Sequence, residues 1–244
     1  MEVGKKQREI LAPICWFSIK GKMIILFNWI DGVTLEEFYK NKSTIEQIII
    51  AIEVGKIISN FHKITKISDH PKILIEKNIV NEFTSKYLSE EYKLKFCSLI
   101  SEFNKTEYEY SLIHYDLRPA NIMIDCDGNL TIIDFEYMNY YPSYADLSLN
   151  FLFSEKYLGF GYGVLYGYYG IQPNEFFWKN QKPLLAVELL RLHNSRRNND
   201  VINKIVLIED YLFTDQLVPK RFHSIYNQYQ KFKEDLDVTN EVFI

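Results

Sequence analysis

The sequence predicts an α+β fold, with a small β region near the N-terminus and helices over most of the remaining chain. Two apolar, partly β-branched runs at 14–19 and 22–29 flank Lys20-Gly21, which is the pattern of a β-hairpin. Apolar residues recur at helical spacing over 44–66, and helical patterns continue from about residue 146 onward. Because strands and helices do not alternate, the order indicates α+β rather than α/β.

The first elements are predicted from breakers and capping residues. Residues 5–11 are expected to form the end of a helix that stops before Pro13, because a residue that precedes proline avoids the helical conformation. After the hairpin, Asp31-Gly32 is expected to form a turn. Thr34 is then expected to cap a short helix.

Helices are expected to make up the greater part of the chain. Ser43 or Thr44 should cap the helix over 44–66, which is apolar on much of its circumference and should be buried on several sides. Residues 73–108 are expected to form two further, more charged helices. In the last third we expect helices at about 146–156, 160–169, 174–178, 183–196, 200–213 and 216–233.

Composition and charge exclude several classes of partner. The chain has 244 residues and a net charge of −4, with acids and bases interspersed, which argues against non-specific nucleic-acid binding. Cys15, Cys97 and Cys126 are far apart and are expected to be reduced thiols. The longest apolar run, Met23–Phe27, is too short to span a bilayer. With no visible signal peptide either, we expect a cytoplasmic protein with neither a nucleic-acid nor a membrane partner.

The most informative stretch is His114-Tyr-Asp-Leu-Arg-Pro-Ala-Asn121, which is followed by Ile133-Asp-Phe-Glu136. A carboxylate at Asp116, in a loop after a short apolar segment, can orient an acceptor hydroxyl and take its proton. Arg118 brings a cation into the same space, where it can neutralise a phosphoryl group during transfer.

A second hairpin places two possible metal ligands at one end. Asn121–Ile124 and Leu130–Ile133 flank Asp127-Gly128, a strong tight-turn signal. Because the hairpin folds back on itself, Asn121 at its start and Asp134 at its finish emerge on the same side. One offers a neutral oxygen and the other a charged oxygen, and hard oxygen ligands are those that magnesium selects.

These two motifs together resemble the catalytic loop and the metal-binding segment of the protein-kinase-like superfamily. Glu136 stands where protein kinases usually have glycine, and Asp146 follows at a spacing similar to that of choline/ethanolamine kinases and aminoglycoside phosphotransferases. The resemblance implies that Asp116 is the catalytic base and that Asn121 and Asp134 bind magnesium. It also implies that Asp146 is a buried acid that braces the catalytic loop, and that Arg118 replaces a loop lysine near the γ-phosphate.

The resemblance extends, more weakly, over residues 9–155 and implies a two-lobed fold. Met23–Gly32 resembles the last strand and hinge of a small lobe, so Asn28, Trp29 and Ile30 are the expected contacts to adenine. The residues before this hinge are too few for a glycine-rich hairpin and a strand lysine. We therefore expect a reduced β lobe at 1–33 and a mainly helical lobe, with the catalytic loop and metal-binding hairpin, at 34–244.

Several residues keep two interpretations at this point. His114 is either a packed residue that holds the turn or a catalytic residue, and Glu136 is either a further metal contact or a structural hydrogen-bond acceptor. Asp146 and His62 are expected to be structural. Arg191, His193, Arg196 and Arg197 form either a solvated helix end or a site for a phosphate-bearing or acidic partner. The tyrosines between 137 and 169, with Trp178, either pack in the core or form an aromatic cage for an ammonium group. Close helix packing or turns are the two interpretations of Gly159, Gly161, Gly163, Gly167 and Gly170.

The resemblance implies an ATP- and magnesium-dependent phosphotransferase that acts on a hydroxyl of a small cationic molecule of the choline, ethanolamine or aminoglycoside class. The alternative is a catalytically impaired pseudokinase, or a truncated paralogue, that binds a nucleotide or a partner; the missing strand lysine favours it, and the intact Asp116, Asn121 and Asp134 oppose it. A protein kinase is a third possibility, which Glu136 opposes.

Overall fold

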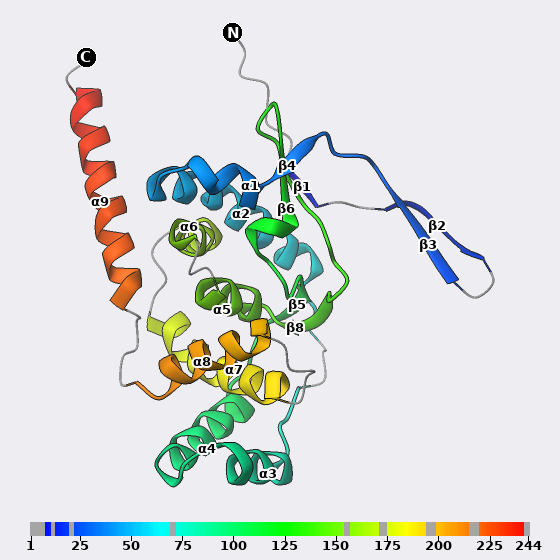
Figure 1. Ribbon diagram of the computed structural model, residues 1–244, viewed down its shortest axis with the longest axis vertical. Coiled ribbons are helices and arrows are strands. Elements are labelled where there is room, and N and C mark those ends of the chain that lie inside the picture. The colour runs from blue at the N-terminus through cyan, green and yellow to red at the C-terminus, as the bar shows by residue number, and fades with distance from the viewer. Residues whose placement is uncertain are drawn as a thin grey trace.

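Strands gather on one side of the molecule and helices form the rest of it (Figure 1). The computed structural model describes residues 8–10, 13–19, 22–68, 72–153, 157–170, 175–193, 199–214 and 220–241. Its strands are β1 (Arg8–Ile10), β2 (Pro13–Ile19), β3 (Lys22–Phe27), β4 (Gly32–Thr34), β5 (Tyr110–Ile113), β6 (Ile122–Asp125), β7 (Leu130–Ile132) and β8 (Asn139–Pro142). Its α-helices are α1 (Leu35–Phe38), α2 (Thr44–Thr65), α3 (Lys77–Tyr87), α4 (Glu90–Lys105), α5 (Tyr144–Phe153), α6 (Leu158–Tyr169), α7 (Glu175–His193), α8 (Asn199–Leu212) and α9 (Lys220–Glu241).

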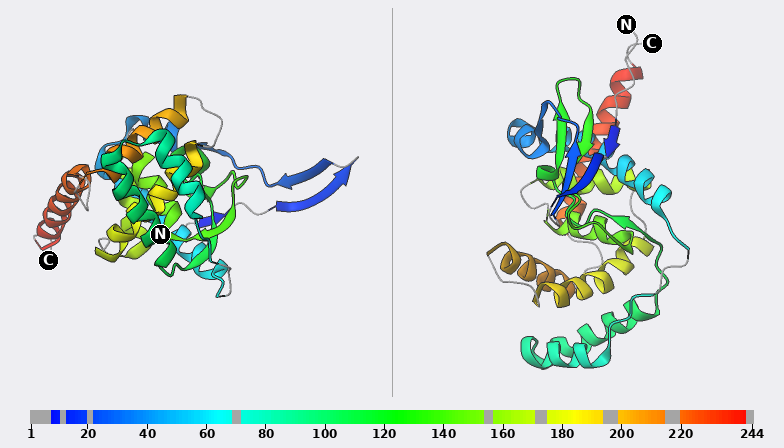
Figure 2. Two further views of the ribbon diagram at one scale, coloured as in Figure 1. Left: turned by 90° about the horizontal axis from the view of Figure 1, so that it is seen from below. Right: turned by 90° about the vertical axis from the view of Figure 1, so that its right-hand side faces the viewer.

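The predicted hairpin is confirmed, and two N-terminal predictions are wrong. β2 and β3 pair antiparallel and project from the helices (Figures 1 and 2). Residues 8–10, expected in a helix, instead form β1, which pairs parallel with β7. Gly32, expected in a turn, begins β4, which pairs with β6. β1 and β4 form because they pair with β7 and β6, which are distant in the sequence. The local sequence pattern does not predict such tertiary pairing.

These pairings build a sheet in the order β1-β7-β6-β4. A Cβ on Gly32 would lie 2.4 Å from the backbone oxygen of Ile124, so that glycine permits the close approach of β4 to β6. The sheet therefore ties β1, from the predicted β lobe, and β4, at the predicted lobe boundary, to the second hairpin, which belongs to the predicted helical lobe. The division at residues 33 and 34 stays a prediction.

Capping residues define the first helices, as expected. Thr34 caps α1 in a capping box with Glu37, whose backbone N–H donates to Thr34 Oγ1 over 3.2 Å. Ser43, rather than Thr44, caps α2, and its partner in the box is Glu46. The prediction of a long buried helix over 44–66 is confirmed by α2, which ends at Thr65.

α2 and α6 pack with their backbones almost in contact. A Cβ on Gly55, Gly159, Gly163 or Gly167 would lie 1.9–2.5 Å from a backbone oxygen of the opposite helix. Of the two interpretations of these glycines, close helix packing is therefore correct for Gly159, Gly163 and Gly167. Gly170 instead ends α6 in the left-handed conformation with φ of 72°.

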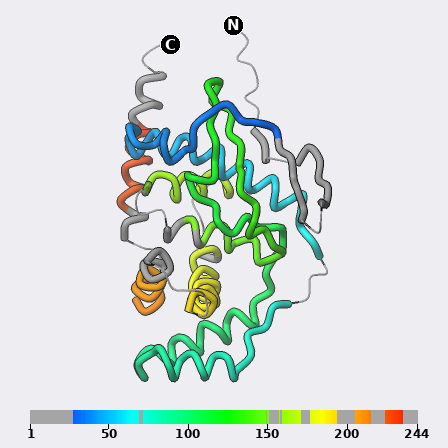
Figure 3. Tube along the Cα trace, turned by 45° about the vertical axis from the view of Figure 1, so that its right-hand side comes forward, coloured from blue at the N-terminus to red at the C-terminus, as the bar shows by residue number. Residues whose placement is uncertain are grey.

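The last third of the chain differs from the prediction in one element. The helices expected at 174–178 and 183–196 are one helix, α7, which continues through Pro183. Proline normally breaks a helix, but the turns after it, including Leu184, Leu185 and Leu189, are buried in the core. α8 and α9 follow, and no helix among the described residues is both long enough and apolar enough to cross a membrane. The trace places α3 and α4 at the opposite end of the molecule from β4 and α1 (Figure 3).

Candidate active site

The predicted catalytic loop lies between β5 and the short 3-10 helix Pro119–Asn121. The side-chain nitrogen of Asn121 donates to Asp116 Oδ2 over 2.8 Å and to the Asp116 carbonyl over 2.9 Å. Arg118 Nε lies 3.0 Å from the same Oδ2. The structure thus brings these three predicted residues together around one partly exposed carboxylate. Asp116 Oδ1 makes no hydrogen bond to the described residues, which leaves it to accept a proton from outside.

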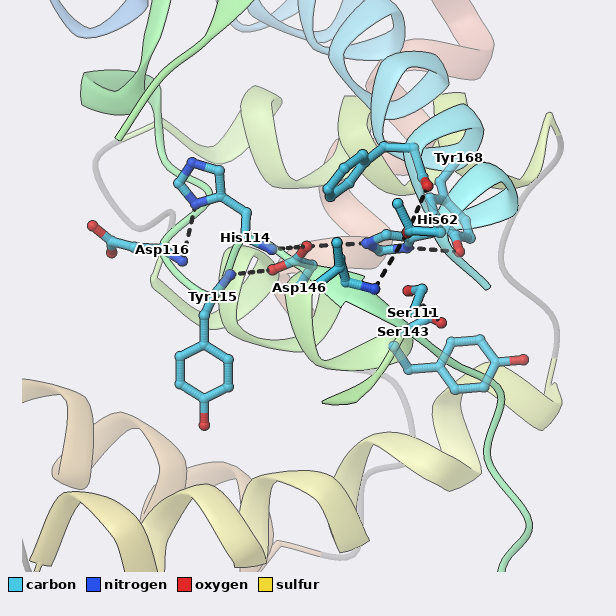
Figure 4. A network of polar contacts seen from close by, with 12 residues as sticks. His62, Ser111, His114, Tyr115, Asp116, Ser143, Asp146 and Tyr168 are labelled. Atoms are coloured by element: carbon cyan, nitrogen blue, oxygen red, sulfur yellow. Dashed lines mark hydrogen bonds and ion pairs between the residues drawn. The ribbon is translucent and has the colours of Figure 1, made fainter. Parts of the chain in front are cut away.

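Asp146 joins the start of this loop to α5. It is buried, and its two carboxylate oxygens accept hydrogen bonds from the backbone N–H groups of His114, over 2.8 Å, and Tyr115, over 2.6 Å (Figure 4). A carboxylate that accepts backbone N–H groups in the interior makes strong, charge-assisted hydrogen bonds. The predicted buried acid therefore contacts the loop at the two residues that precede Asp116.

His62 completes this network from α2. Its side chain is 3% exposed; Nε2 lies 3.1 Å from Asp146 Oδ2, and Nδ1 lies 3.0 Å from the Tyr168 hydroxyl (Figure 4). Both ring nitrogens have partners, which confirms the interpretation of His62 as a satisfied core histidine. Its contact with Asp146 was not predicted, because a single histidine at the end of an apolar helix carries no local signal of its partner.

Asp134 is anchored through the residue before it. The backbone N–H of Ile133 donates to the Asn121 carbonyl over 3.0 Å, and the Ile133 carbonyl lies 2.8 Å from His114 Nε2. The buried His114 ring also packs against Phe135, with centroids 4.6 Å apart. Asp134 itself is exposed and has a φ of 66°, a conformation that a non-glycine residue keeps only where its surroundings hold it.

Negative charge concentrates on this side of the loop. The pKa of Tyr137 is raised, first by its hydrogen bond to Glu136 and next by the Glu136 charge. The charges of Asp116 and Asp134 raise it further, so all three carboxylates lie within electrostatic reach of one hydroxyl. Glu136 is exposed and engages Tyr137, which is a structural contact; a metal contact by Glu136 stays untested.

The donor set at this face fits a magnesium ion. Both hydrogen bonds of the Asn121 amide nitrogen go to Asp116, so its oxygen is the atom left for a cation. The exposed Asp134 carboxylate supplies a second hard oxygen. Within the described ranges, no three His, Cys, Asp or Glu side chains converge closely enough to hold a metal by themselves. An ion here would take its remaining ligands from phosphate and water.

The predicted hinge residues connect β3 to β4. Asn28 and Trp29 are exposed, the latter to 91%, and Ile30 is partly buried. β4 pairs with β6, the strand that directly follows Asn121. The hinge segment is therefore joined through one strand pair to the hairpin that carries both expected metal ligands.

Of the two interpretations of the tyrosines between 137 and 169, core packing holds for most of them. Tyr157, Tyr162 and Trp178 are buried, and the tyrosines from 141 to 169 that are partly buried pack against the same core. Only Tyr137 and Tyr140, within this set, are exposed. In the basic cluster, Arg191 pairs with Glu188 and His193 lies 3.6 Å from Glu209, whereas residues 196 and 197 lie outside the described residues.

Sequence reasoning missed a small pocket beside the catalytic loop. Its lining comes from separate elements and consists of Tyr115, Tyr141, Ala145, Ser148, Leu184, Leu185 and Glu188. No motif joins β8, α5 and α7 in the sequence, so only the folded structure shows that these residues meet.

Comparison with solved structures shows the fold. The chain is similar to a choline/ethanolamine kinase family protein from Mesorhizobium loti, with 10% identity and a TM-score of 0.56 over 88% of this chain and 78% of that one. It is similar to APH(2″)-IIa in complex with gentamicin, with 16% identity and a TM-score of 0.51 over 89% and 77% of the two chains. It is also similar to ADP-bound aminoglycoside phosphotransferase APH(2″)-Ib, with 16% identity and a TM-score of 0.51 over 89% and 78%.

Comparison of the sequence with family models and with curated proteins gives two results. No curated protein matches the chain significantly. The model of the phosphotransferase enzyme family (APH) matches residues 16–157, which is more than half of the chain and includes the catalytic loop, Asp134 and Asp146. The chain therefore belongs to the phosphotransferase enzyme family, with the protein-kinase-like α+β fold of choline/ethanolamine kinases and aminoglycoside phosphotransferases.

Proposed function

We propose that this chain transfers the γ-phosphoryl group of ATP to a hydroxyl of a small cationic molecule, in a magnesium-dependent reaction. The observation that carries the proposal is the geometry around Asp116. Its carboxylate is oriented by Asn121 and Arg118 through one oxygen, while the other oxygen is left to accept a proton. A chain of this family whose loop was only structural would have no need of an oriented, partly exposed carboxylate.

The proposed reaction assigns one task to each residue of the loop. The acceptor hydroxyl gives its proton to Asp116 as its oxygen bonds to the γ-phosphorus, and the bond from that phosphorus to the bridging oxygen of ADP breaks. Arg118, whose side chain is 57% exposed, can turn from Asp116 toward the phosphoryl oxygens and neutralise their charge. Asn121 holds Asp116 in direction throughout, since its amide nitrogen donates to Asp116 Oδ2 and to the backbone carbonyl of Asp116.

Asn121 and Asp134 are the proposed magnesium ligands, through the amide oxygen and the carboxylate. Bound magnesium supplies charge neutralisation for the nucleotide phosphates. The backbone of Asn28, Trp29 and Ile30 is the proposed contact for adenine. The ADP-bound state of one similar phosphotransferase supports a nucleotide site in this fold.

The acceptor class is proposed from charge and from the similar structures. The carboxylates of Asp116, Asp134 and Glu136 make the face around Tyr137 negative, which favours a cationic acceptor. The solved structures that resemble this chain include a choline/ethanolamine kinase family protein and a gentamicin complex. Amino-alcohols and aminoglycosides are therefore the acceptors to test first.

The test has two stages. Thermal unfolding is first measured with magnesium and ATP together and with each alone; a ligand at a hundred times its dissociation constant stabilises the fold by about 2.7 kcal/mol. ADP formation is then measured with choline, ethanolamine and gentamicin. Asp116→Asn should keep the thermal shift and lower turnover by about 10²- to 10⁴-fold, the usual contribution of a general base.

Asp127→Asn is the matched control, because Asp127 is an exposed carboxylate in the turn of the same hairpin. It should leave binding and turnover unchanged. Full turnover by Asp116→Asn would refute the assignment of the base. A thermal shift without ADP formation from any acceptor would favour the nucleotide-binding pseudokinase, and the absence of any shift would refute the nucleotide site.

A further inference from the structure

Tyr115, the residue directly before Asp116, is held in an unusual backbone conformation. Its φ is 69°, in the left-handed region that bulky residues rarely adopt. A residue keeps such a conformation only when its surroundings over-determine it. Tyr115 is bound at both ends: its backbone N–H donates to Asp146 Oδ1 over 2.6 Å, and its hydroxyl donates to Glu188 Oε2 over 2.7 Å.

Glu188 is a buried acid in the C-terminal half of α7. Its side chain is 6% exposed, whereas that of Arg191, its ion-pair partner one turn later, is 51% exposed. Arg191 Nε lies 3.0 Å from Oε1 and 2.8 Å from Oε2 of Glu188. A buried carboxylate is tolerated only when it is paired and hydrogen-bonded. Arg191 and Tyr115 together meet that requirement.

The three side chains form a closed unit. The Arg191 guanidinium lies over the Tyr115 ring, 4.9 Å from its centroid, in cation–π geometry. Tyr141 packs edge-to-face against the same ring, with centroids 5.7 Å apart. Burial, and next the Glu188 charge, raise the pKa of Tyr115 far above its ordinary value, so its hydroxyl stays protonated and donates.

The Tyr115 ring points away from the Asp116 carboxylate (Figure 4). Tyr115 therefore acts on Asp116 through the backbone that the two residues share, and not by contact with the reacting atoms. Its hydroxyl contact with α7 and its N–H contact with α5 hold the Cα of Tyr115 from two sides. The peptide that follows carries the N–H of Asp116, which donates to His114 Nδ1 over 3.3 Å, so the backbone from which the Asp116 side chain leaves is restrained directly before that residue.

We propose that Tyr115 and Glu188 are positioning residues that set the direction of the Asp116 carboxylate from α7, an inference that rests on the proposed phosphotransferase function. Displacement of a catalytic group by about 1 Å can lower the rate by about 10²-fold. Tyr115→Phe and Glu188→Gln should therefore lower kcat by about 10- to 100-fold. The KM for magnesium-ATP should change by less than about twofold, because neither residue belongs to the proposed nucleotide contacts.

The kinetic test compares wild type, Tyr115→Phe, Glu188→Gln and the double variant. If Tyr115 acts through Glu188, the double variant is no slower than the slower single variant. Tyr157→Phe is the control, because it removes a buried tyrosine hydroxyl that donates to the Glu36 carbonyl, outside the catalytic loop. An unchanged kcat in Tyr115→Phe, or an equal fall in Tyr157→Phe, would overturn the proposal.

Amide hydrogen exchange supplies a readout that does not depend on turnover. The peptide that spans residues 114–118 should exchange at least about 10-fold faster in Tyr115→Phe and Glu188→Gln, and at the wild-type rate in Tyr157→Phe. If wild type shows no turnover but exchange rises as stated, the proposed function fails and the restraint by α7 stands. If wild type turns over and exchange is unchanged in both variants, the restraint fails and the function stands. Should Glu188→Gln not fold, Tyr115→Phe, which loses a single hydroxyl, decides the outcome.

Discussion

Replacement of Asp146 by asparagine should weaken the hydrogen bonds that brace the predicted catalytic loop and so lower the stability of the fold. Asp146 accepts one backbone N–H on each carboxylate oxygen, from His114 and from Tyr115. Asparagine has the same shape but only one oxygen, so one of the two buried N–H groups must face an amide nitrogen. A hydrogen bond to a charged acceptor contributes about 1.5–3 kcal/mol, and Asp146→Asn should lower the free energy of unfolding by about that amount.

Urea unfolding followed by circular dichroism measures this loss as a lower transition midpoint at an unchanged slope. Asp125→Asn is the comparison, because Asp125 also accepts two backbone N–H groups, from Asp127 and Asn129, but at the exposed turn of the second hairpin. It should lose less stability than Asp146→Asn. If Asp146→Asn unfolds within about 0.5 kcal/mol of wild type, as a neutral surface substitution does, then the two short hydrogen bonds do not brace the loop.

Three further outcomes follow from the contacts. Gly167→Ala should lower the melting temperature strongly, because the new Cβ would lie 1.9 Å from the Ile52 carbonyl; a melting temperature equal to that of wild type would contradict the close packing of α2 and α6. Ser43→Ala should lower the free energy of unfolding by about 1 kcal/mol through loss of the α2 cap, measured in urea. The backbone hydrogen bond from Ser43, with Lys42 nearby, lowers the pKa of Glu46 to about 2, below its ordinary value of 4.5. The stabilising effect of the ionised Glu46 side chain is therefore fully present above about pH 4.5 and is lost as pH falls toward 2. Wild type and Glu46→Gln should differ in melting temperature at pH 6 and converge near pH 2.

Local signals predicted the parts of the fold that local interactions build. The β2–β3 hairpin and the caps at Thr34 and Ser43 depend on residues within a few positions of one another. β1 and β8 depend instead on partner strands far along the chain, β7 and β5, and neither has a pattern of its own. The continuity of α7 through Pro183 likewise depends on burial by other elements, which overrides the local preference of proline.

The same division applies to the candidate site. Asp116, Arg118 and Asn121 lie within one short loop, so their spacing was enough to predict that they meet. Asp134 could be placed because a hairpin returns the chain to its start. Glu188 and His62 could not be found this way, because each is a single residue in an apolar helix whose partner lies many positions away.

The glycine-lined contact between α2 and α6 determines whether side chains from the two helices can meet beside Asp146. His62 extends from α2 and Tyr168 from α6, and they meet beside Asp146 at the distances that an imidazole and a phenol can cover. A bulkier residue at any of the four glycines would move the two helix axes apart and leave a gap that neither ring can bridge. The glycines therefore set the distance between α2 and α6 that this hydrogen-bond network requires, although they have no side chain that takes part in it. Substitution of these glycines, although they are remote from the proposed phosphate site, would then first change the direction of the Asp146 carboxylate.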